Sequence, residues 1–223
     1  MLRAIIFDYN GVLVDDLSIH EDAYLYAAET HGFPLTRALV HDHISHAPDK
    51  KRHLYFGDIS DGMWAQIQST KNGYYARRVQ EKDLLFPHAE SVLSSLSGTY
   101  RLALLSNTSR NDFNRVFPGN LSMLFEETLF AEEVDHPKPD PDPLLRIIRR
   151  LKISKKRCCY VGDSVLDIHM SKAAGIPGYG VATGHSTTDE LKRAGALDVA
   201  TSLTDLKKKL NPACINRSQT DPI

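Results

Sequence analysis

Residues 4–15, AIIFDYNGVLVD, are the most informative stretch of the 223-residue chain. The first four side chains are apolar, the run ends at Asp8, and Gly11 follows at a point where the backbone can turn sharply. A short, fully apolar run is typical of a strand that is buried on both faces of a parallel sheet. Ligand sites in open α/β sheets lie at the carboxyl ends of such strands. We therefore expect Asp8 to end a buried strand and to face a ligand site.

The rest of the chain divides into a helical block and a block in which helices and strands alternate. Residues 17–85 show a helical pattern without a convincing strand, whereas from residue 86 onward the two patterns alternate. This alternation predicts an α/β fold with a doubly wound parallel sheet and right-handed crossovers. We expect residues 1–15 and 86–210 to form the α/β core, residues 16–85 an inserted helical cap, and residues 211–223 a flexible tail. The further strands are expected at 101–105, 128–131, 158–161, 178–182 and 198–199.

Composition and charge exclude several classes of function. The formal net charge of −1 gives no general attraction for nucleic acid, and the arginines and lysines of 146–157 are predicted to form a solvated outer face. No apolar run is long enough to span a bilayer, and we expect no signal peptide. The three cysteines are too few for a disulfide framework, and neighbouring Cys158 and Cys159 should point to opposite faces of a buried strand. We expect a cytoplasmic protein without a nucleic-acid or membrane partner.

Two further predicted strand ends carry polar groups suited to phosphoryl chemistry. Ser106 and Asn107 end one strand and offer a hydroxyl group and backbone N–H groups to phosphate oxygens. Lys138 lies just before a helix, where its ammonium could neutralise a phosphoryl group and keep Asp8 ionised. Because the carboxyl ends of parallel strands share one edge of the sheet, these groups are predicted to meet at Asp8.

A pair of carboxylates at another strand end indicates a metal site. Asp163 lies at the amino end of a predicted helix and Asp167 four residues later, so that both lie on one side of its first turn. Carboxylates crowded beside Asp8 would repel one another unless a hard divalent cation lay between them. Mg²⁺ fits, because it binds one or two carboxylates together with water and substrate phosphate.

Together these residues resemble the motifs of the haloacid dehalogenase superfamily, whose first motif usually reads Asp-x-Asp-Gly-(Thr/Val)-Leu-x-Asp. The intact Gly-Asp-Ser-x-x-Asp at 162–167 favours its Mg²⁺-dependent branch, and the cap position is similar to that of phosphoglycolate phosphatase and β-phosphoglucomutase. The resemblance implies a phosphatase that acts on a small phosphorylated metabolite through an aspartyl-phosphate. Its nucleophile would be Asp8, its phosphate ligands Gly11, Ser106, Asn107 and Lys138, and its metal ligands Asp8, the Asn10 backbone oxygen, Asp163 and Asp167.

Asn10 departs from this pattern, because phosphatases of the superfamily carry a second aspartate there. That aspartate protonates the leaving group and later activates water, and an amide can do neither. General acid–base catalysis contributes about 10²–10⁴-fold, so we expect turnover of alkyl phosphates to fall by that factor. Asn10→Asp should raise turnover, and phosphates with good leaving groups should be the better substrates.

The sequence predicts the contacts between cap and substrate less specifically than the core residues of the site. His41, His43, His46 and His53 flank the basic run of Lys50, Lys51 and Arg52. Some of this run is expected to contact an anionic substrate, and His20 matches a histidine common at the cap entrance of the resembled subclass. Two alternatives stay open: a phosphonatase-like carbon–phosphorus hydrolase, which would need a cap lysine that the sequence does not single out, and an attenuated protein that binds a phosphorylated metabolite. The sequence does not indicate the oligomeric state.

Overall fold

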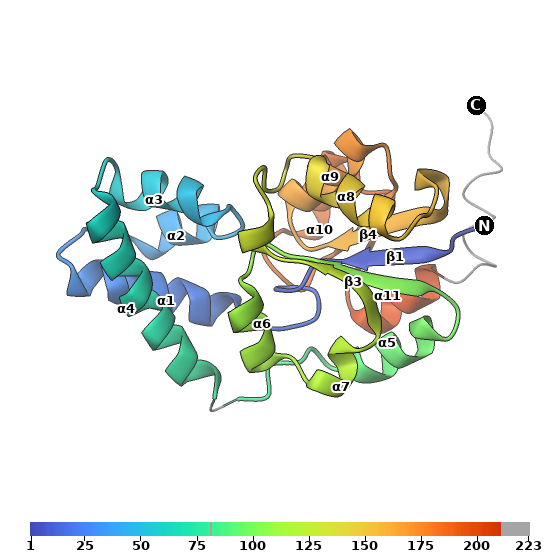
Figure 1. Cartoon of the computed structure of the whole chain (residues 1–223), viewed down its shortest axis with the longest axis horizontal. Coiled ribbons are helices and arrows are strands. Elements are labelled where there is room, and N and C mark those ends of the chain that lie inside the picture. Colours follow the sequence, from blue (N-terminus) through green and yellow to red (C-terminus); the bar gives the residue numbers. More distant parts are fainter. Residues whose placement is uncertain (81, 211–223) are drawn as a thin grey trace.

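A six-stranded parallel sheet forms the centre of the computed structural model, which describes residues 1–80 and 82–210 (Figure 1). The strands lie in the order β3-β2-β1-β4-β5-β6, so the chain winds outward in one direction from β1 and then in the other from β4. A switch point therefore lies between β1 and β4, where open α/β sheets place their ligands. The predicted fold class is confirmed. The strands are β1 (Ala4–Phe7), β2 (Arg101–Leu105), β3 (Phe125–Leu129), β4 (Cys158–Gly162), β5 (Gly178–Val181) and β6 (Asp198–Ala200).

Helices cover both faces of the sheet because successive strand side chains alternate between two cores. Ile5 and Phe7 of β1 join one hydrophobic cluster, whereas Ala4 and Ile6 join the other. Cys159 and Cys158 divide in the same way, as the sequence predicts. One face carries α5 (Ala89–Ser97), α6 (Arg110–Val116), α7 (Gly119–Ser122) and α11 (Leu203–Lys209), and the other carries α8 (Asp142–Arg150), α9 (Val165–Ala174) and α10 (Thr188–Ala194). Two short 3₁₀ helices, Ala131–Glu133 and Lys155–Arg157, complete this part.

Four helices between β1 and α5 stand to one side of the sheet with a hydrophobic cluster of their own (Figure 1). They are α1 (Leu17–Thr30), α2 (Arg37–His43), α3 (Pro48–Phe56) and α4 (Asp61–Val79). Thr36 and Ser60 cap α2 and α4 by accepting hydrogen bonds from backbone N–H groups of the first turn. Their shared cluster includes Tyr24, Tyr55 and Ile67. This packing supports the proposal that residues 16–85 form a cap.

Some predicted boundaries are displaced, for local reasons. The third strand runs from Phe125 to Leu129, not over 128–131, because β3 is an edge strand in which Glu126 can face outward. The helix predicted to follow Lys138 begins at Asp142, directly after Pro141. The predicted tail, residues 211–223, lies outside the described residues. Within residues 1–80 and 82–210, no helix is both long and apolar enough to cross a bilayer.

Candidate active site

The loops that follow β1 and β4 close tightly against each other at the switch point. Gly11 has φ +73°, a backbone conformation that side chains with a Cβ rarely adopt. A Cβ at Gly11 would lie 2.2 Å from Asp163 Oδ2, and one at Gly184 would lie 2.0 Å from the same atom. Gly11 therefore packs against Asp163 and does not line the cavity where we predicted it to contact phosphate. Because Gly11 has no side chain, the loop after β1 can approach the loop after β4 closely.

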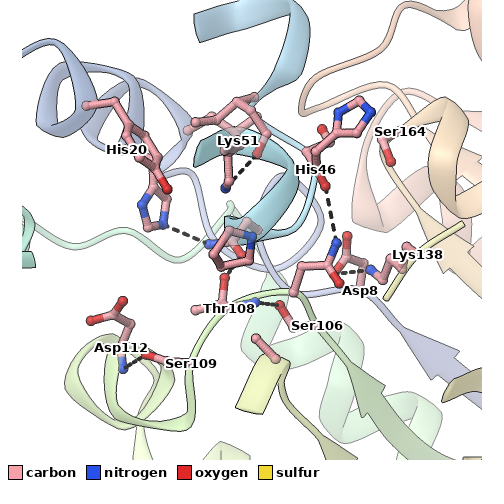
Figure 2. Close-up of a pocket in the computed structure, with 18 of the residues that line it drawn as sticks. Asp8, His20, His46, Lys51, Ser106, Thr108, Ser109, Asp112, Lys138 and Ser164 are labelled. Atoms are coloured by element: carbon pink, nitrogen blue, oxygen red, sulfur yellow. Dashed lines mark hydrogen bonds and ion pairs between the residues drawn. The ribbon is translucent and has the colours of Figure 1, made fainter. Parts of the chain in front are cut away.

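Lys138 contacts both Asp8 and Asp167, and Figure 2 shows its ammonium beside Asp8. Its Nζ lies 2.8 Å from Asp8 Oδ1 and 2.9 Å from Asp167 Oδ1, and the residue is only 5% exposed. The backbone N–H of Tyr9 donates to the same Asp8 oxygen at 2.7 Å. Asp8 Oδ2 has no hydrogen-bond partner among the described residues. One carboxylate oxygen is thus fixed while the other is free for a substrate or a metal.

The charge balance of this cluster is negative. Burial raises the pKa of Asp8 to about 7; Lys138 opposes this rise and Asp167 adds to it. Burial, Asp167 and Asp8 raise the pKa of Asp163 well above its usual range. Burial would lower the pKa of Lys138, but Asp167 and Asp8 raise it, so the ammonium stays charged. The single positive charge of Lys138 does not neutralise three ionised carboxylates, and a divalent cation would complete the balance.

These carboxylates fit a hard divalent cation. One oxygen from each of Asp8, Asp163 and Asp167 lies within 4.8 Å of the others. Asp163 Oδ2 accepts a hydrogen bond from the His185 backbone N–H at 2.7 Å, which leaves Oδ1 for a metal. Both Asp167 oxygens are already engaged, Oδ1 by Lys138 and Oδ2 by Ser164 Oγ at 2.6 Å. Asp8 and Asp163 are therefore the better candidates for direct ligands, and Asp167 for a group that orients Lys138.

The predicted phosphate ligands after β2 lie at the same place. Ser106 is buried at the cavity wall, and its Oγ accepts a hydrogen bond from the Thr108 backbone N–H at 3.0 Å. The Asn107 side chain lines the cavity but donates to the Ser45 carbonyl of the cap at 3.2 Å. Asn107 thus joins the core to the cap in this structure.

Asn10 is fixed by a buried network that the sequence reasoning missed. Its amide nitrogen donates to both oxygens of Asp16, each at 2.9 Å, and its amide oxygen accepts from the Thr108 hydroxyl. Asp16 is fully buried and also accepts from Tyr75 Oη at 2.6 Å and pairs with His20 Nε2 at 3.3 Å. Despite its burial, Asp16 keeps a lowered pKa because His20, Tyr75 and Asn10 stabilise the carboxylate. In the sequence, the one feature that could have pointed to Asp16 is its position directly before a helix, as the second of two adjacent aspartates.

The cavity between core and cap has a volume of about 160 Å³. Of the predicted cap contacts, His20 and Lys51 line it. Lys50 does not and is exposed. Arg52 lies elsewhere, where it pairs with Asp61 at 2.8 Å. The lining residues given by the sequence are Asp8, Asn10, His20, Lys51, Ser106, Asn107, Lys138 and Asp163.

Other residues of the cavity were not predicted. Lys71 is the most important of them, because it is buried at 6% exposure and carries a potential charge. The histidines of the cap do not gather at one point: His46 lines the cavity, His41 pairs with Glu21 at 2.7 Å, and His53 with Asp58 at 3.4 Å. Missed lining residues with polar side chains include Tyr24, Gln68, Lys71, Asn72, Thr108 and Asp112.

Comparison with known proteins agrees with this geometry. Residues 5–181 match the haloacid dehalogenase-like hydrolase family. The chain belongs to this family. The match covers both loops of the switch point and the helical insertion between them, and it confirms the resemblance found in the sequence.

Individual relatives match over nearly their whole lengths. A phosphorylated carbohydrates phosphatase from Thermotoga maritima is 28% identical over 204 residues, which cover 88% of this chain and 93% of that protein. The phosphoglycolate phosphatase of Escherichia coli is 26% identical over 230 residues, covering 92% of this chain and 91% of that protein. A solved haloacid dehalogenase-like hydrolase from Bacteroides fragilis superimposes with a TM-score of 0.81 at 23% identity, covering 92% of this chain and all of that one. Fold and hydrolase family are therefore shared across the chain.

Proposed function

We propose that this protein is a Mg²⁺-dependent phosphatase of the cytoplasm that hydrolyses a small phosphorylated metabolite through an aspartyl-phosphate on Asp8. The observation that carries the proposal is the arrangement of Lys138 between Asp8 and Asp167, with Asp163 beside them and a cavity in front. The names of the relatives, all phosphatases, point to the same reaction class. The buried free thiols of Cys158 and Cys159 suit a reducing compartment.

Each residue of the site has a separate role in the proposed reaction. An oxygen of Asp8 would attack phosphorus while the bond to the leaving oxygen breaks, and water would later release inorganic phosphate and restore the carboxylate. Lys138 and the Ser106 hydroxyl would hold phosphoryl oxygens. Asp8, Asp163 and the Asn10 carbonyl would hold the Mg²⁺, which when bound offsets the charge between carboxylates and phosphate. Lys138 also keeps Asp8 oriented through Oδ1.

Asn10 cannot give a proton to the leaving group, because a carboxamide is not acidic near neutral pH, and its Nδ2 is held 2.9 Å from both oxygens of Asp16. The leaving oxygen must therefore take its proton from water. Substrates with acidic leaving groups, such as acyl and aryl phosphates, are expected to react faster than alkyl phosphates. The fixed amide also supports a second candidate function, a protein that binds a phosphorylated metabolite and turns it over slowly.

One screen separates these functions. Acetyl phosphate, p-nitrophenyl phosphate and a panel of small alkyl phosphates are incubated with wild type and with Asp8→Asn, each with Mg²⁺ or with EDTA. Release of phosphate that needs both Mg²⁺ and Asp8 supports the phosphatase. Release that persists in Asp8→Asn excludes the aspartyl-phosphate. Binding without release in wild type supports the second candidate.

A further inference from the structure

Two lysines lie on the cap side of the cavity without a carboxylate partner. Lys51 of α3 and Lys71 of α4 both line the cavity, and Figure 2 shows Lys51 extending from the cap toward it. Their Nζ atoms lie 5.2 and 5.6 Å from the centre of the same ring, that of Tyr24. Lys71 also lies 5.1 Å from the ring of Tyr75. No carboxylate among the described residues is within ion-pair distance of either ammonium.

This arrangement is unfavourable while the cavity holds no anion. Burial and the neighbouring Lys71 lower the pKa of Lys51 to about 7. Burial also lowers the pKa of Lys71, against the opposing effect of Asp112 and Asp16. Two like charges out of water repel each other and lose hydration, and a ligand anion between them would reverse both effects.

Unused hydrogen-bond donors surround the same place. Lys51 gives one N–H to the Ile44 carbonyl at 3.1 Å, and an ammonium has three. The amide nitrogen of Gln68 is buried at the cavity wall and makes no hydrogen bond of normal geometry among the described residues, although the Gln68 side chain lies close enough to Tyr24 to oppose the rise in the pKa of that phenol. Buried donors of this kind are normally satisfied, so an acceptor is expected there.

We infer that Lys51, Lys71 and Gln68 form a second anion subsite, so that the substrate carries a carboxylate or a second phosphate in addition to the phosphoryl group. The inference rests on the proposed function for the placement of the first phosphoryl group at Asp8. The cavity of about 160 Å³ limits the size of the molecule. A cavity of about 150 Å³ takes a ligand the size of benzene, so the two anionic groups are expected to be joined by about two or three carbons.

Three two-carbon probes test the subsite: 2-phosphoglycolate, ethane-1,2-diyl bisphosphate and 2-hydroxyethyl phosphate. They share one phosphate monoester and differ only in whether the other end is a carboxylate, a phosphate or a neutral hydroxyl. Binding is measured by calorimetry to the Asp8→Asn protein with Mg²⁺, so that hydrolysis does not interfere. Both two-anion probes should bind roughly ten- to hundredfold tighter than 2-hydroxyethyl phosphate. The tighter of the two tells whether the second group is a carboxylate or a phosphate.

Variants in the same Asp8→Asn background locate the effect. Lys51→Met and Lys71→Met should each reduce the affinity ratio about tenfold. Lys50→Met is the matched control, because it removes the same charge from the exposed neighbour of Lys51 and should leave the ratio intact. Circular dichroism checks folding, and Lys51→Gln provides a polar replacement if the methionine variant is unstable. Equal binding of all three probes, or a ratio that neither lysine variant changes, would overturn the inference.

The outcome is separable from that of the proposed function. If wild type hydrolyses none of the probes but Asp8→Asn shows the ratio, the subsite stands and the phosphatase does not. If wild type hydrolyses all three probes equally well and Asp8→Asn binds them with equal affinity, the phosphatase stands and the subsite does not. Borohydride reduction in the presence of phosphonoacetaldehyde gives a further check. A reduced adduct on Lys51 or Lys71 would assign that lysine to imine formation and contradict the subsite, whereas an unmodified protein is the expected result.

Discussion

The core and cap ends of the cavity hold their charges in opposite ways. At the core end, Lys138 is in contact with both Asp8 and Asp167, and the surplus is negative. At the cap end, Lys51 and Lys71 both lie against the ring of Tyr24 without a carboxylate in ion-pair range among the described residues, and the surplus is positive. The core end therefore suits a metal and any phosphoryl group, whereas the cap end suits one particular kind of substrate. Reaction type and selectivity are expected to respond to different substitutions.

The largest effect is expected at the core end. Asp8→Asn removes the nucleophile and should lower kcat by roughly 10³–10⁶-fold, because the neutral amide cannot form the covalent phosphate intermediate. The cap lysines are untouched, so the variant should still discriminate between the two-anion and one-anion probes. Phosphate release by wild type and variant gives the first quantity, and calorimetry the second. Asp189→Asn, at an exposed position on α10, is the control. Loss of discrimination in Asp8→Asn would show that the two ends are not independent.

The second effect concerns the contact between Asn10 and Asp16, where the core meets the cap. Asn10→Asp alone would place a carboxylate against the buried Asp16, so that the pair must share a proton or separate. Combining it with Asp16→Asn exchanges the two groups and keeps one amide and one carboxylate in contact. We expect the exchanged protein to hydrolyse alkyl phosphates about 10²-fold faster than wild type, and Asn10→Asp alone to gain less and melt at a lower temperature.

Asp16→Asn alone is the control for the exchange, since it changes the network without supplying an acid at position 10. Initial rates with an alkyl phosphate and with p-nitrophenyl phosphate measure the outcome. The gain should be larger for the alkyl phosphate, whose leaving group needs the proton, than for p-nitrophenyl phosphate, which would gain only from faster hydrolysis of the aspartyl-phosphate. An exchanged protein no faster than wild type would contradict the assignment of the missing acid.

The two ends also differ in how far the sequence predicts them. Asp8, Ser106, Lys138 and Asp163 were identified because each follows a strand of one parallel sheet, and strand order alone brings their carboxyl ends together. Lys71 was missed because it lies in the middle of a helix, where its burial depends on how α4 packs on α1. A lysine at such a position is usually solvated, and nothing local marks it as buried.

Asp16 shows the same limit at shorter range. Its neighbour Asp15 is exposed, whereas Asp16 is buried against Asn10, His20 and Tyr75, and Tyr75 lies fifty-nine residues away in the sequence. Lys50 and Lys51 show the same contrast, because neighbouring residues on a helix point in different directions: Lys50 is exposed, whereas Lys51 lines the cavity. Contacts that depend on strand order were therefore predictable, and those that depend on the rotation of cap helices were not.

The third effect is a pH dependence of metal binding at the core end. Burial raises the pKa of Asp8 to about 7, and burial together with Asp167 and Asp8 raises the pKa of Asp163 well above its usual range, so both hold protons below neutral pH. Mg²⁺ must displace them, and its affinity should rise as pH increases toward 7, by up to about a hundredfold per pH unit where both protons are displaced. Calorimetry in buffers of different ionisation enthalpy should detect the released protons. Affinity that is the same at pH 5.5 and pH 7.5 would contradict this.

The same raised pKa values predict how stability depends on pH without metal. Between its ordinary pKa and about 7, Asp8 binds a proton in the folded state that the unfolded state has released. The free energy of unfolding should therefore fall as pH rises through this window, and added Mg²⁺ should restore it at neutral pH. Melting temperatures at pH 5 and pH 7.5, with Mg²⁺ or with EDTA, measure the effect. Asp8→Asn is expected to flatten the dependence.

The smallest effect is a pH dependence of selectivity at the cap end. The groups packed around Lys51 are Lys71 from α4, Tyr24 from α1 and, close by, His46 before α3. Its pKa of about 7 means that the ammonium is lost as pH rises through neutrality. The ratio of kcat/KM for 2-phosphoglycolate to that for 2-hydroxyethyl phosphate reports the free enzyme, and the shared phosphate group cancels. We expect this ratio to fall a few-fold, roughly three- to tenfold, between pH 6 and pH 8.5.

Lys51→Arg sharpens this test, because a guanidinium stays protonated throughout that range. The variant should keep whatever preference it has at pH 6 up to pH 8.5, whereas Lys50→Arg should titrate like wild type. A wild-type ratio that is constant with pH, or one that falls equally in Lys51→Arg, would mean that another group sets the preference. Because the metal-dependent change acts on the phosphate group that both probes share, it cancels in the ratio, and only a group that contacts the second anion can produce the fall. The cap end would then be distinguished from the core end by its own titration, in the opposite direction to that of Asp8.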